Sequence, residues 1–453
     1  MADSAIRVSM ISLGCCKNQV DAEVLLADLR QHGFELVGDV SNSDAVIINT
    51  CGFIQSAKEE AIENILEMAE LKKEGTIKAI IVTGCMAERY RDEITDEIAE
   101  VDAVLGIGSN GEICEAVARA VADPGGEKYL SFGPKENLRL NGERVLTTLP
   151  YYAYIKIAEG CDNCCTYCAI PKIRGRFRSR AMEDILAEAQ WLAQEGVREL
   201  IVVAQDTTRY GEDLYGEYKL AELLRELCRI EGFRWIRTLY CYPDKITDEL
   251  LDVMASEEKL VKYLDIPIQH CNEQVLRAMN RGMDRRELTA LIKKIRARIP
   301  GVTLRTTLLL GFPGETGEQF SELCSFTDDV KFDRLGCFTY SAEEGTVAGE
   351  MEHQIDPEVK ARREEIVMNQ QAVIMERLNR KKIGKTIEVL VEGFDKYGEC
   401  YFGRSEADAP DIDGKIFFTS EKNLVMGDFV PVKIEEVMDY DLVGTCVADA
   451  ACD

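Results

Sequence analysis

Apolar runs of strand length alternate with helical patterns through most of the chain, and this alternation limits the possible folds more than any other feature. The first runs are "IRVSMISLG" (6–14), "AVIINTC" (45–51), "AIIVTGC" (79–85) and "AVLGIG" (103–108), with amphipathic segments such as "DAEVLLADLRQHG" between them. Strands that alternate with helices form parallel sheets covered by helices on both faces. The pattern predicts an open parallel α/β domain over residues 1–125.

A second, longer alternation follows a stretch rich in Gly, Pro and charge, and residues 126–148 are therefore predicted to form a linker. Six further strand candidates follow it: "YAYIKIAEG", "ELIVVAQD", "IRTLYC", "YLDIPIQH", "TLRTTLLLG" and "LGCFTYS". Six βα units indicate a partial TIM barrel, (βα)6, with its chemistry at the C-terminal ends of the strands. This central domain is predicted over residues 149–382, including a charged helix from about Pro357 to Lys382.

Residues 383–453 have a different pattern, with short alternating strands separated by glycine turns, as in "IGKTIEVLVEGF" and "GKIFFTS". Strands of this kind favour a small all-β barrel. The predicted architecture is thus an α/β chain of three domains.

The composition of the 453-residue chain narrows the possible functions. It has 17 cysteines, an odd number, and no basic segment followed by a long apolar one at its start, so a disulfide framework is not expected and clustered cysteines indicate metal or redox use. We expect a cytoplasmic protein without a membrane span. The net charge of −27 disfavours stable binding of a nucleic acid, because the overall field repels a polyanion.

Three distant cysteines are predicted to meet at one edge of the first sheet. Cys15, Cys51 and Cys85 each follow a separate predicted strand, and the C-terminal ends of parallel strands share one rim. Cys16 is next to Cys15, but adjacent residues at a strand end point in opposite directions, and only Cys15 directly follows Gly. The three positions indicate an iron–sulfur cluster with one iron that has no protein ligand. The alternative is three buried cysteines that happen to end strands.

Four more cysteines lie within eight residues in "CDNCCTYC", directly after the first strand of the predicted barrel. Cys161, Cys164 and Cys168 have the spacing C-x2-C-x3-C, and Cys161, Cys165 and Cys168 have the spacing C-x3-C-x2-C. Paired C-x2-C segments are also typical of zinc sites, but those pairs normally come from separate segments, and here they adjoin. The spacing alone leaves the choice open.

The C-x3-C-x2-C spacing at this position resembles the radical S-adenosylmethionine (SAM) enzymes, in which three cysteines hold a [4Fe-4S] cluster and the fourth iron binds SAM. The resemblance extends over nearly the whole chain. The segments "SLGCCKNQVDAE", "INTCGFIQSAKEE" and "VTGCMAERY" look like the N-terminal domain of the radical SAM methylthiotransferases, and the last domain resembles a TRAM domain. The resemblance implies two [4Fe-4S] clusters, one held by Cys161, Cys165 and Cys168 and an auxiliary one held by Cys15, Cys51 and Cys85.

The family's chemistry fits a hard reaction, because an unactivated C–H bond offers no acidic proton to a general base. The resemblance implies that one SAM is cleaved reductively to a 5′-deoxyadenosyl radical, and that a second SAM methylates the inserted sulfur. It also implies a sulfur donor and an electron donor such as flavodoxin or ferredoxin. An iron–sulfur electron carrier would not need a barrel of six units.

Polar residues at the predicted catalytic rim of the barrel are candidate contacts to SAM. "AQDTTRYG" ends the second strand, "LDIPIQH" the fourth and "LLLGFPGET" the fifth. The candidates are Gln205, Asp206, Gln269, His270, Gly311 and Glu315. The alternative is that they are turn and cap residues, and the sequence identifies no catalytic residue.

Two types of methylthiotransferase share this architecture: the MiaB type modifies an adenosine in transfer RNA, and the RimO type modifies the β-carbon of an aspartate in ribosomal protein S12. The stretches "AQDTTRYG", "YLDIPIQH", "FTYSAEEGT" and "GRSEADAPDIDG" resemble the RimO type. From Ile387 to Cys446 the chain has five basic and fourteen acidic residues, a charge of −9. A domain that binds RNA should be basic, whereas an acidic one suits a basic protein. We therefore expect ribosomal protein S12 as the partner, free or in the small subunit.

Overall fold

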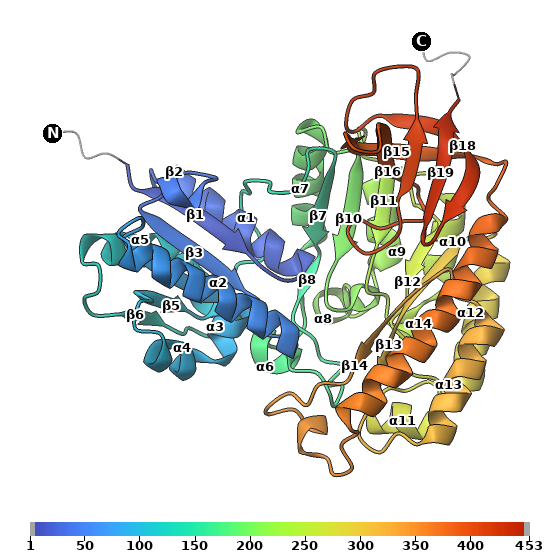
Figure 1. Ribbon diagram of the computed structural model, residues 1–453, viewed down its shortest axis with the longest axis horizontal. Helices are drawn as coiled ribbons and strands as arrows, with labels where there is room; N and C mark the ends of the chain where they lie inside the picture. The colour runs from blue at the N-terminus through green and yellow to red at the C-terminus, as the bar shows by residue number, and fades with distance from the viewer. Residues whose placement is uncertain (1–4, 448–453) are drawn as a thin grey trace.

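The computed structural model describes residues 5–447 of the chain. The outermost residues of the first and last predicted domains, 1–4 and 448–453, lie outside the described part. Three bodies follow one another from the N-terminus to the C-terminus (Figure 1): an α/β domain, a central half-open barrel and a small β-barrel.

The N-terminal domain is built on a six-stranded sheet in the order β2-β1-β3-β4-β5-β6, and all its neighbouring strands are parallel. Its two faces carry separate apolar cores, because the buried side chains of each strand alternate between them. The predicted open parallel sheet is confirmed. The strands are β1 (Arg7–Ser12), β2 (Glu35–Leu36), β3 (Ala45–Thr50), β4 (Ala79–Gly84), β5 (Ala103–Leu105) and β6 (Tyr129–Ser131), and the helices are α1 (Cys16–Gln31), α2 (Gln55–Lys73), α3 (Cys85–Arg89), α4 (Arg91–Glu97) and α5 (Ile113–Ala122).

The sheet extends into the segment that the sequence pattern predicts to be a linker. Strand β6 lies within residues 126–148 and pairs with β5. Further along this segment, Arg144 is buried and donates hydrogen bonds to Glu23 of α1 (Nη2 to Oε2, 2.5 Å) and to Glu188 of the central domain (Nη1 to Oε1, 2.5 Å). The linker is therefore fastened to both domains.

The central domain is an open barrel of six parallel strands. Strands β11-β10-β7 form one sheet and β12-β13-β14 another, and a single bridge between Ile236 and Leu260 joins them. A large apolar core lies between these sheets and the outer helices. The partial (βα)6 barrel is confirmed. The six barrel strands are β7 (Tyr152–Lys156), β10 (Glu199–Val203), β11 (Trp235–Thr238), β12 (Tyr263–Asp265), β13 (Thr303–Leu310) and β14 (Arg334–Thr339). Strands β8 (Ala158–Glu159) and β9 (Arg178–Ser179) form a separate antiparallel pair. The helices of the domain are α6 (Ile170–Arg174), α7 (Met182–Gln194), α8 (Glu212–Tyr215), α9 (Leu220–Cys228), α10 (Asp248–Ser256), α11 (Glu273–Ala278), α12 (Arg285–Arg298), α13 (Gly317–Val330) and α14 (Pro357–Arg380).

The C-terminal domain is a closed five-stranded barrel in the order β15-β16-β17-β19-β18, as the sequence predicts. Its loop 405–414 fills the end of the central barrel where the strands begin. There, Arg404 binds Glu199 (Nη2 to Oε2, 2.7 Å), and Tyr263 donates a hydrogen bond to Asp413 (2.6 Å). The strands are β15 (Thr386–Asp395), β16 (Cys400–Arg404), β17 (Ile416–Thr419), β18 (Phe429–Met438) and β19 (Asp441–Cys446).

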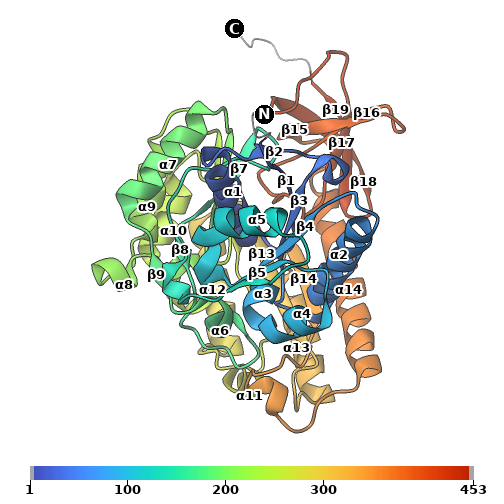
Figure 2. The same ribbon diagram turned by 90° about the vertical axis from the view of Figure 1, so that its left-hand side faces the viewer.

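The N-terminal domain covers the opposite end of the central barrel, where β7, β10 and β11 end. Figure 2 views the molecule from the side of this domain. Helix α1 lies against β7, and its Val20 packs with Tyr154 and Val203 of the barrel interior. The first domain thus partly covers the end of the barrel at which these strands end. Within residues 5–447, no helix is both long and apolar enough to cross a membrane.

Candidate active site

Cys15, Cys51 and Cys85 lie at one rim of the N-terminal sheet, as the sequence predicts. They follow β1, β3 and β4, which are neighbours in the sheet. Gly14 has a φ of +87°, and a Cβ there would lie 2.5 Å from the Cβ of Cys51. Only glycine accommodates both this conformation and this close approach. The turn therefore brings the loop of Cys15 against Cys51.

The charges around the rim act differently on the three thiols. Burial raises the pKa of Cys85 to about 12 and also raises the pKa of Cys51. Burial opposes ionisation of Cys15 as well, but the positive charges of Lys17 and Arg174 hold its pKa below the ordinary value. Iron binds the thiolate, and a bound metal ion deprotonates its cysteine ligands, so these cations favour the ligating state of the rim.

Cys16 contacts a different part of the molecule from Cys15. Its Sγ lies 3.9 Å from the hydroxyl of Tyr240, at the end of β11, and Cys16 packs against the apolar interior of the barrel. The neighbouring Lys17 places its Nζ 3.3 Å from the centroid of the Tyr240 ring. These contacts support the assignment of Cys15, and not Cys16, to the rim.

The loop 161–168 is held in place by backbone hydrogen bonds at both ends. The N–H of Cys161 donates to the carbonyl of Gly175 (3.2 Å), and the N–H of Thr166 donates to that of Met279 (3.1 Å). Cys164 has a φ of +51° and is exposed, whereas Cys161, Cys165 and Cys168 are half-buried. The loop thus separates Cys164 from the three cysteines with the C-x3-C-x2-C spacing.

Cys165 has two polar neighbours that sequence reasoning did not single out. The hydroxyl of Tyr242 lies 3.7 Å from its Sγ, and Nη1 of Arg281 lies 3.9 Å from the same atom. The Arg281 guanidinium stacks 4.1 Å from the centre of the Tyr242 ring. Tyr242 follows β11 and Arg281 follows α11, and nothing in their local sequence points to a cysteine more than 70 positions away.

The donor set of each cysteine group fits an iron–sulfur cluster. Within the described residues, no group of three or more His, Cys, Asp or Glu side chains is arranged to hold a metal ion. A [4Fe-4S] cluster makes a different demand, because its cysteine ligands each bind a separate iron. Three thiols with cationic donors beside them meet that demand, on three neighbouring strand ends in one group and on the single loop 161–168 in the other.

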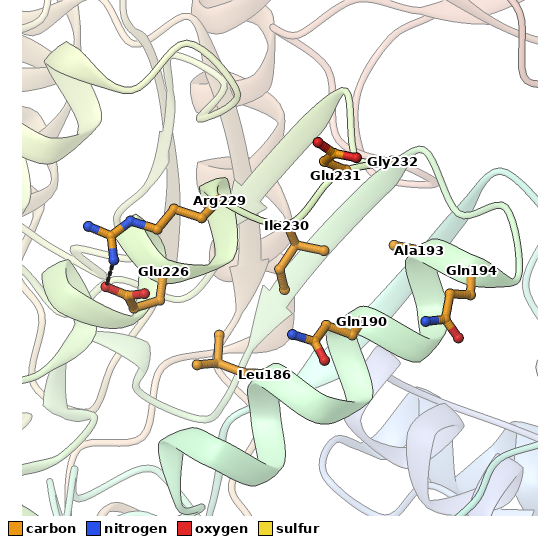
Figure 3. Close-up of a pocket in the computed structure, with 9 residues that line it drawn as sticks. All are labelled: Leu186, Gln190, Ala193, Gln194, Glu226, Arg229, Ile230, Glu231 and Gly232. Carbon is orange, nitrogen blue, oxygen red and sulfur yellow. Dashed lines mark hydrogen bonds and ion pairs between the residues drawn. The ribbon is translucent and has the colours of Figure 1, made fainter.

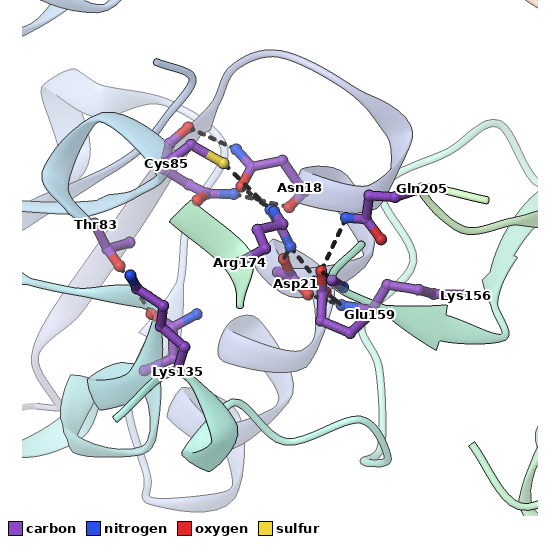
Figure 4. A network of polar contacts seen from close by, with 12 residues as sticks. Asn18, Asp21, Thr83, Cys85, Lys135, Lys156, Glu159, Arg174 and Gln205 are labelled. Atoms are coloured by element: carbon purple, nitrogen blue, oxygen red, sulfur yellow. Dashed lines mark hydrogen bonds and ion pairs between the residues drawn. The ribbon is translucent and has the colours of Figure 1, made fainter. Parts of the chain in front are cut away.

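One cysteine of the rim, Cys85, lies against the short helix α6, which begins two residues after Cys168. Ala169, which follows Cys168, packs against Cys85 together with Ile173. Figure 4 shows the polar network beside this contact, centred on the buried Arg174. Arg174 donates hydrogen bonds to Asp21 (2.7 Å) and Glu159 (2.9 Å) through Nη1, and Nη2 lies 3.4 Å from the Cys85 Sγ.

Lys156 completes this network, which sequence reasoning missed. Its Nζ forms ion pairs with Asp21 and with Glu159 (2.8 Å to Oε2). Two carboxylates thus lie against two cations, and burial without such pairing would be costly. Glu159 and Arg174 flank the cysteine loop in the sequence, and this placement is the only signal that could have indicated them.

Two of the six candidate SAM contacts lie next to the cysteine loop. Gln205 donates a hydrogen bond to Glu159 (Nε2 to Oε1, 2.9 Å), and its buried Oε1 has no protein partner among the described residues. Asp206 accepts a hydrogen bond from Asn163 of the loop (2.8 Å) and lies 3.5 Å from the Lys245 ammonium. Both side chains are therefore near Cys161.

The other four candidates lie at the ends of β12 and β13. Gln269 has a φ of +70° and forms a bridge to Leu308. His270 is buried, its Nδ1 accepts from the N–H of Asn272 (2.9 Å), and burial lowers its pKa to about 3.

Gly311 and Glu315 form one turn. Glu315 accepts the N–H of Gly311 (2.8 Å), and its other oxygen accepts from Arg363 (2.9 Å). These hydrogen bonds of Glu315 close the turn and attach it to α14, which carries Arg363.

One depression of the described structure lies away from the cysteines. It has a volume of about 600 Å³ and lies between α7 and α9 on the outer surface of the barrel (Figure 3). Leu186, Gln190 and Ile230 are among its lining residues. None of the candidate residues lines it.

Three family descriptions match the chain in succession. Residues 7–106 match the Uncharacterized protein family UPF0004, residues 155–327 match the Radical SAM superfamily, and residues 383–447 match the TRAM domain. These ranges fall on the three bodies of the fold.

Proteins named "Ribosomal protein uS12 methylthiotransferase RimO" are similar over nearly the whole length. The one from Desulforamulus reducens is 50% identical, over 96% of this chain and 98% of its own. The one from Caldanaerobacter subterraneus subsp. tengcongensis is 50% identical over 96% and 99%, and one from Clostridium botulinum is 48% identical over 98% and 99%.

Solved structures show the fold at much lower identity. The radical SAM methyltransferase TsrM from Kitasatospora setae has a TM-score of 0.54 and 16% identity, over 74% of this chain and 73% of that one. The cobalamin-dependent SAM radical enzyme OxsB has a TM-score of 0.51 and 14% identity, over 82% and 56%.

Proposed function

Because the chain belongs to the radical SAM methylthiotransferases of the RimO family, we propose that it transfers a methylthio group to the β-carbon of an aspartate in ribosomal protein S12. The reaction uses two SAM molecules and a sulfur donor, and takes electrons from a carrier such as flavodoxin or ferredoxin. The observation that carries the proposal is the contact of Cys85 with α6, the helix that follows the cysteine loop 161–168, because sulfur insertion at a radical requires the sulfur source near the radical site.

Each cysteine group holds one [4Fe-4S] cluster in this proposal. Cys161, Cys165 and Cys168 bind the cluster that cleaves SAM, and Cys15, Cys51 and Cys85 bind the auxiliary cluster that serves in sulfur transfer. The cofactors supply the radical and the sulfur, and the protein supplies binding and orientation. Arg281 and Tyr242 hold Cys165, and Asn280 holds the loop by donating from Nδ2 to the Cys164 carbonyl (3.1 Å).

The proposed SAM site lies at the end of β10. Within residues 5–447 the Oε1 of Gln205 has no partner, so it offers an acceptor for an amino or hydroxyl group, since a buried oxygen without a partner is costly unless a ligand or water supplies one. The Asp206 carboxylate lies against the same loop. Gln269, His270, Gly311 and Glu315 shape the neighbouring part of the rim.

The charge of the C-terminal barrel supports a protein substrate. From Ile387 to Cys446 the charge is −9, and the whole chain carries −27. Such a field attracts a basic ribosomal protein and repels the phosphates of an RNA.

Mass spectrometry of ribosomes from a strain that lacks the gene tests the substrate. We expect the S12 aspartate to lose its methylthio mass, and transfer RNA to keep its methylthio-adenosines. A copy of the gene with Cys165→Ala is the matched control, because it supplies the folded chain without the cluster that binds SAM. Normal S12 together with unmodified transfer RNA would replace this proposal by the transfer RNA alternative.

A further inference from the structure

Arg174 belongs to the central domain but directs its guanidinium at the N-terminal one. It is buried and ends α6, directly after the cysteine loop. Its Nη2 donates to Oδ1 of Asn18 (3.2 Å) and lies 3.4 Å from the Sγ of Cys85. The distance to the sulfur is short enough for an N–H···S hydrogen bond.

Asn18 ties the same contact to the loop of Cys15. Its Nδ2 donates to the carbonyl of Leu13 (2.8 Å), two residues before Cys15. Arg174 therefore touches one proposed ligand of the auxiliary cluster and supports the turn that carries a second. A guanidinium can do this while it binds two carboxylates, because its donors form a rigid planar fork.

The charges of the network balance without the cysteine. Asp21 and Glu159 carry two negative charges, and Lys156 and Arg174 carry two positive ones. The N–H that faces Cys85 is thus not needed to neutralise a carboxylate. This N–H of Arg174 can therefore stabilise negative charge on the Cys85 sulfur.

We propose that Arg174 is a positioning residue that raises the reduction potential of the auxiliary cluster through its N–H···S hydrogen bond to Cys85. The inference rests on the proposed function, because it requires a cluster at Cys15, Cys51 and Cys85. Reduction adds negative charge to a cluster, and a hydrogen bond to a ligand sulfur stabilises the reduced form more than the oxidised one. The sulfur-supplying centre is in this way held by a residue of the domain that cleaves SAM.

The test isolates the auxiliary cluster in the full-length chain. In a background of Cys161→Ala, Cys165→Ala and Cys168→Ala, only the rim cysteines can hold a cluster. Arg174→Lys and Arg174→Met are made in this background, and Arg281→Lys is the matched control, because Arg281 is a buried arginine beside the other cysteine loop. Iron and labile sulfide are measured first, and the midpoint potential is then measured by a redox titration followed by electron paramagnetic resonance.

Arg174→Lys keeps a cation but lacks the fork, so we expect the cluster content to stay and the potential to fall. A tenfold fall in the reduction equilibrium constant corresponds to about 59 mV for one electron. Arg174→Met should lower the potential further, and Arg281→Lys should leave it unchanged. If Arg174→Met does not fold, the midpoint potential of Arg174→Lys, compared with that of Arg281→Lys, decides the test.

Equal potentials in the Arg174→Lys variant and the control would overturn the inference and leave the auxiliary cluster standing. Absence of iron from the background protein with Arg174 intact would instead refute the proposed second cluster, and the inference with it. The metal content therefore separates the two failures.

Discussion

At the scale of single residues, two pairs of adjacent cysteines show how the backbone sends neighbouring thiols to different surroundings. Cys164 and Cys165 are neighbours, but Cys164 has a left-handed conformation and is exposed, whereas Cys165 is held beside Tyr242 and Arg281. Cys15 and Cys16 divide in the same manner between the rim and the barrel interior. Spacing alone left the first pair undecided.

The loop makes a direct prediction about these neighbours. Cys165→Ala should abolish formation of 5′-deoxyadenosine, because in the proposed function SAM then loses the iron that binds and reduces it, and Cys164→Ala should leave it nearly unchanged. Cys161→Ala and Cys168→Ala should behave like Cys165→Ala. The measurement is 5′-deoxyadenosine by chromatography after anaerobic reconstitution with SAM and a strong reductant. An active Cys165→Ala protein with an inactive Cys164→Ala protein would reverse the assignment.

At the scale of elements, the strands were predictable and several connections were not. The runs that became β3, β4 and β10 are fully buried, and such strands read as continuous apolar stretches. Strand β6 has three residues, "YLS", inside a polar segment, so no hydrophobic pattern marks it. Ion pairs between distant elements leave no local pattern at all, which is why Arg174, Arg144 and Arg404 were not predicted.

The loop 405–414 should be essential to the stability of the central barrel. Arg404→Met should destabilise the protein by about 1.5–3 kcal/mol, because it removes a charge-assisted hydrogen bond from the buried Glu199 and leaves Arg237 as the remaining cation. Arg234→Met is the control: its partner Glu388 also lies in the last domain, but this exposed pair contributes about 1 kcal/mol or less. The free energy of unfolding in urea gives both values, and equal losses would contradict this account.

The same interface predicts how stability depends on pH. The pKa of Glu199 is lowered, since the Coulomb attraction of Arg404 and Arg237 outweighs the effect of burial, and Arg334 similarly lowers the pKa of Asp408. A depressed folded pKa adds stability above the unfolded value, 4.5 for Glu and 3.8 for Asp, and that stability is lost as the pH falls. The melting temperature should therefore decline below about pH 4.5. The melting temperature of Glu199→Gln should fall less steeply with pH in this range than that of the unchanged protein. An equally steep fall would show that the interface is not the cause.

At the scale of the whole molecule, the two smaller domains attach to opposite ends of one open barrel. The N-terminal domain lies over the C-terminal ends of β7, β10 and β11, and the last barrel fills the end where the strands begin. The domain order was evident in the sequence, but how the domains pack was not. The N-terminal sheet nevertheless has two apolar cores of its own.

These separate cores predict the outcome of removing one cluster. A protein with Cys15→Ala, Cys51→Ala and Cys85→Ala should keep its fold and lose about half of its iron, because in the proposed function each cysteine group holds one four-iron cluster. It should still form 5′-deoxyadenosine but transfer no methylthio group to an S12 peptide. Iron, sulfide, 5′-deoxyadenosine and modified peptide are measured on reconstituted proteins. Unchanged iron, or continued methylthio transfer, would exclude a cluster at the rim.

The network at α6 also restricts how such a chain can evolve by recombination. Asp21 and Arg174 are 153 positions apart and are encoded on either side of the segment where an exchange of domains would occur. A crossover between them would combine the carboxylate of one parent with the cation of the other. It would also separate Arg144 from either Glu23 or Glu188 of its own parent. Genes of this architecture should therefore pass their first two domains on together, as a single heritable unit.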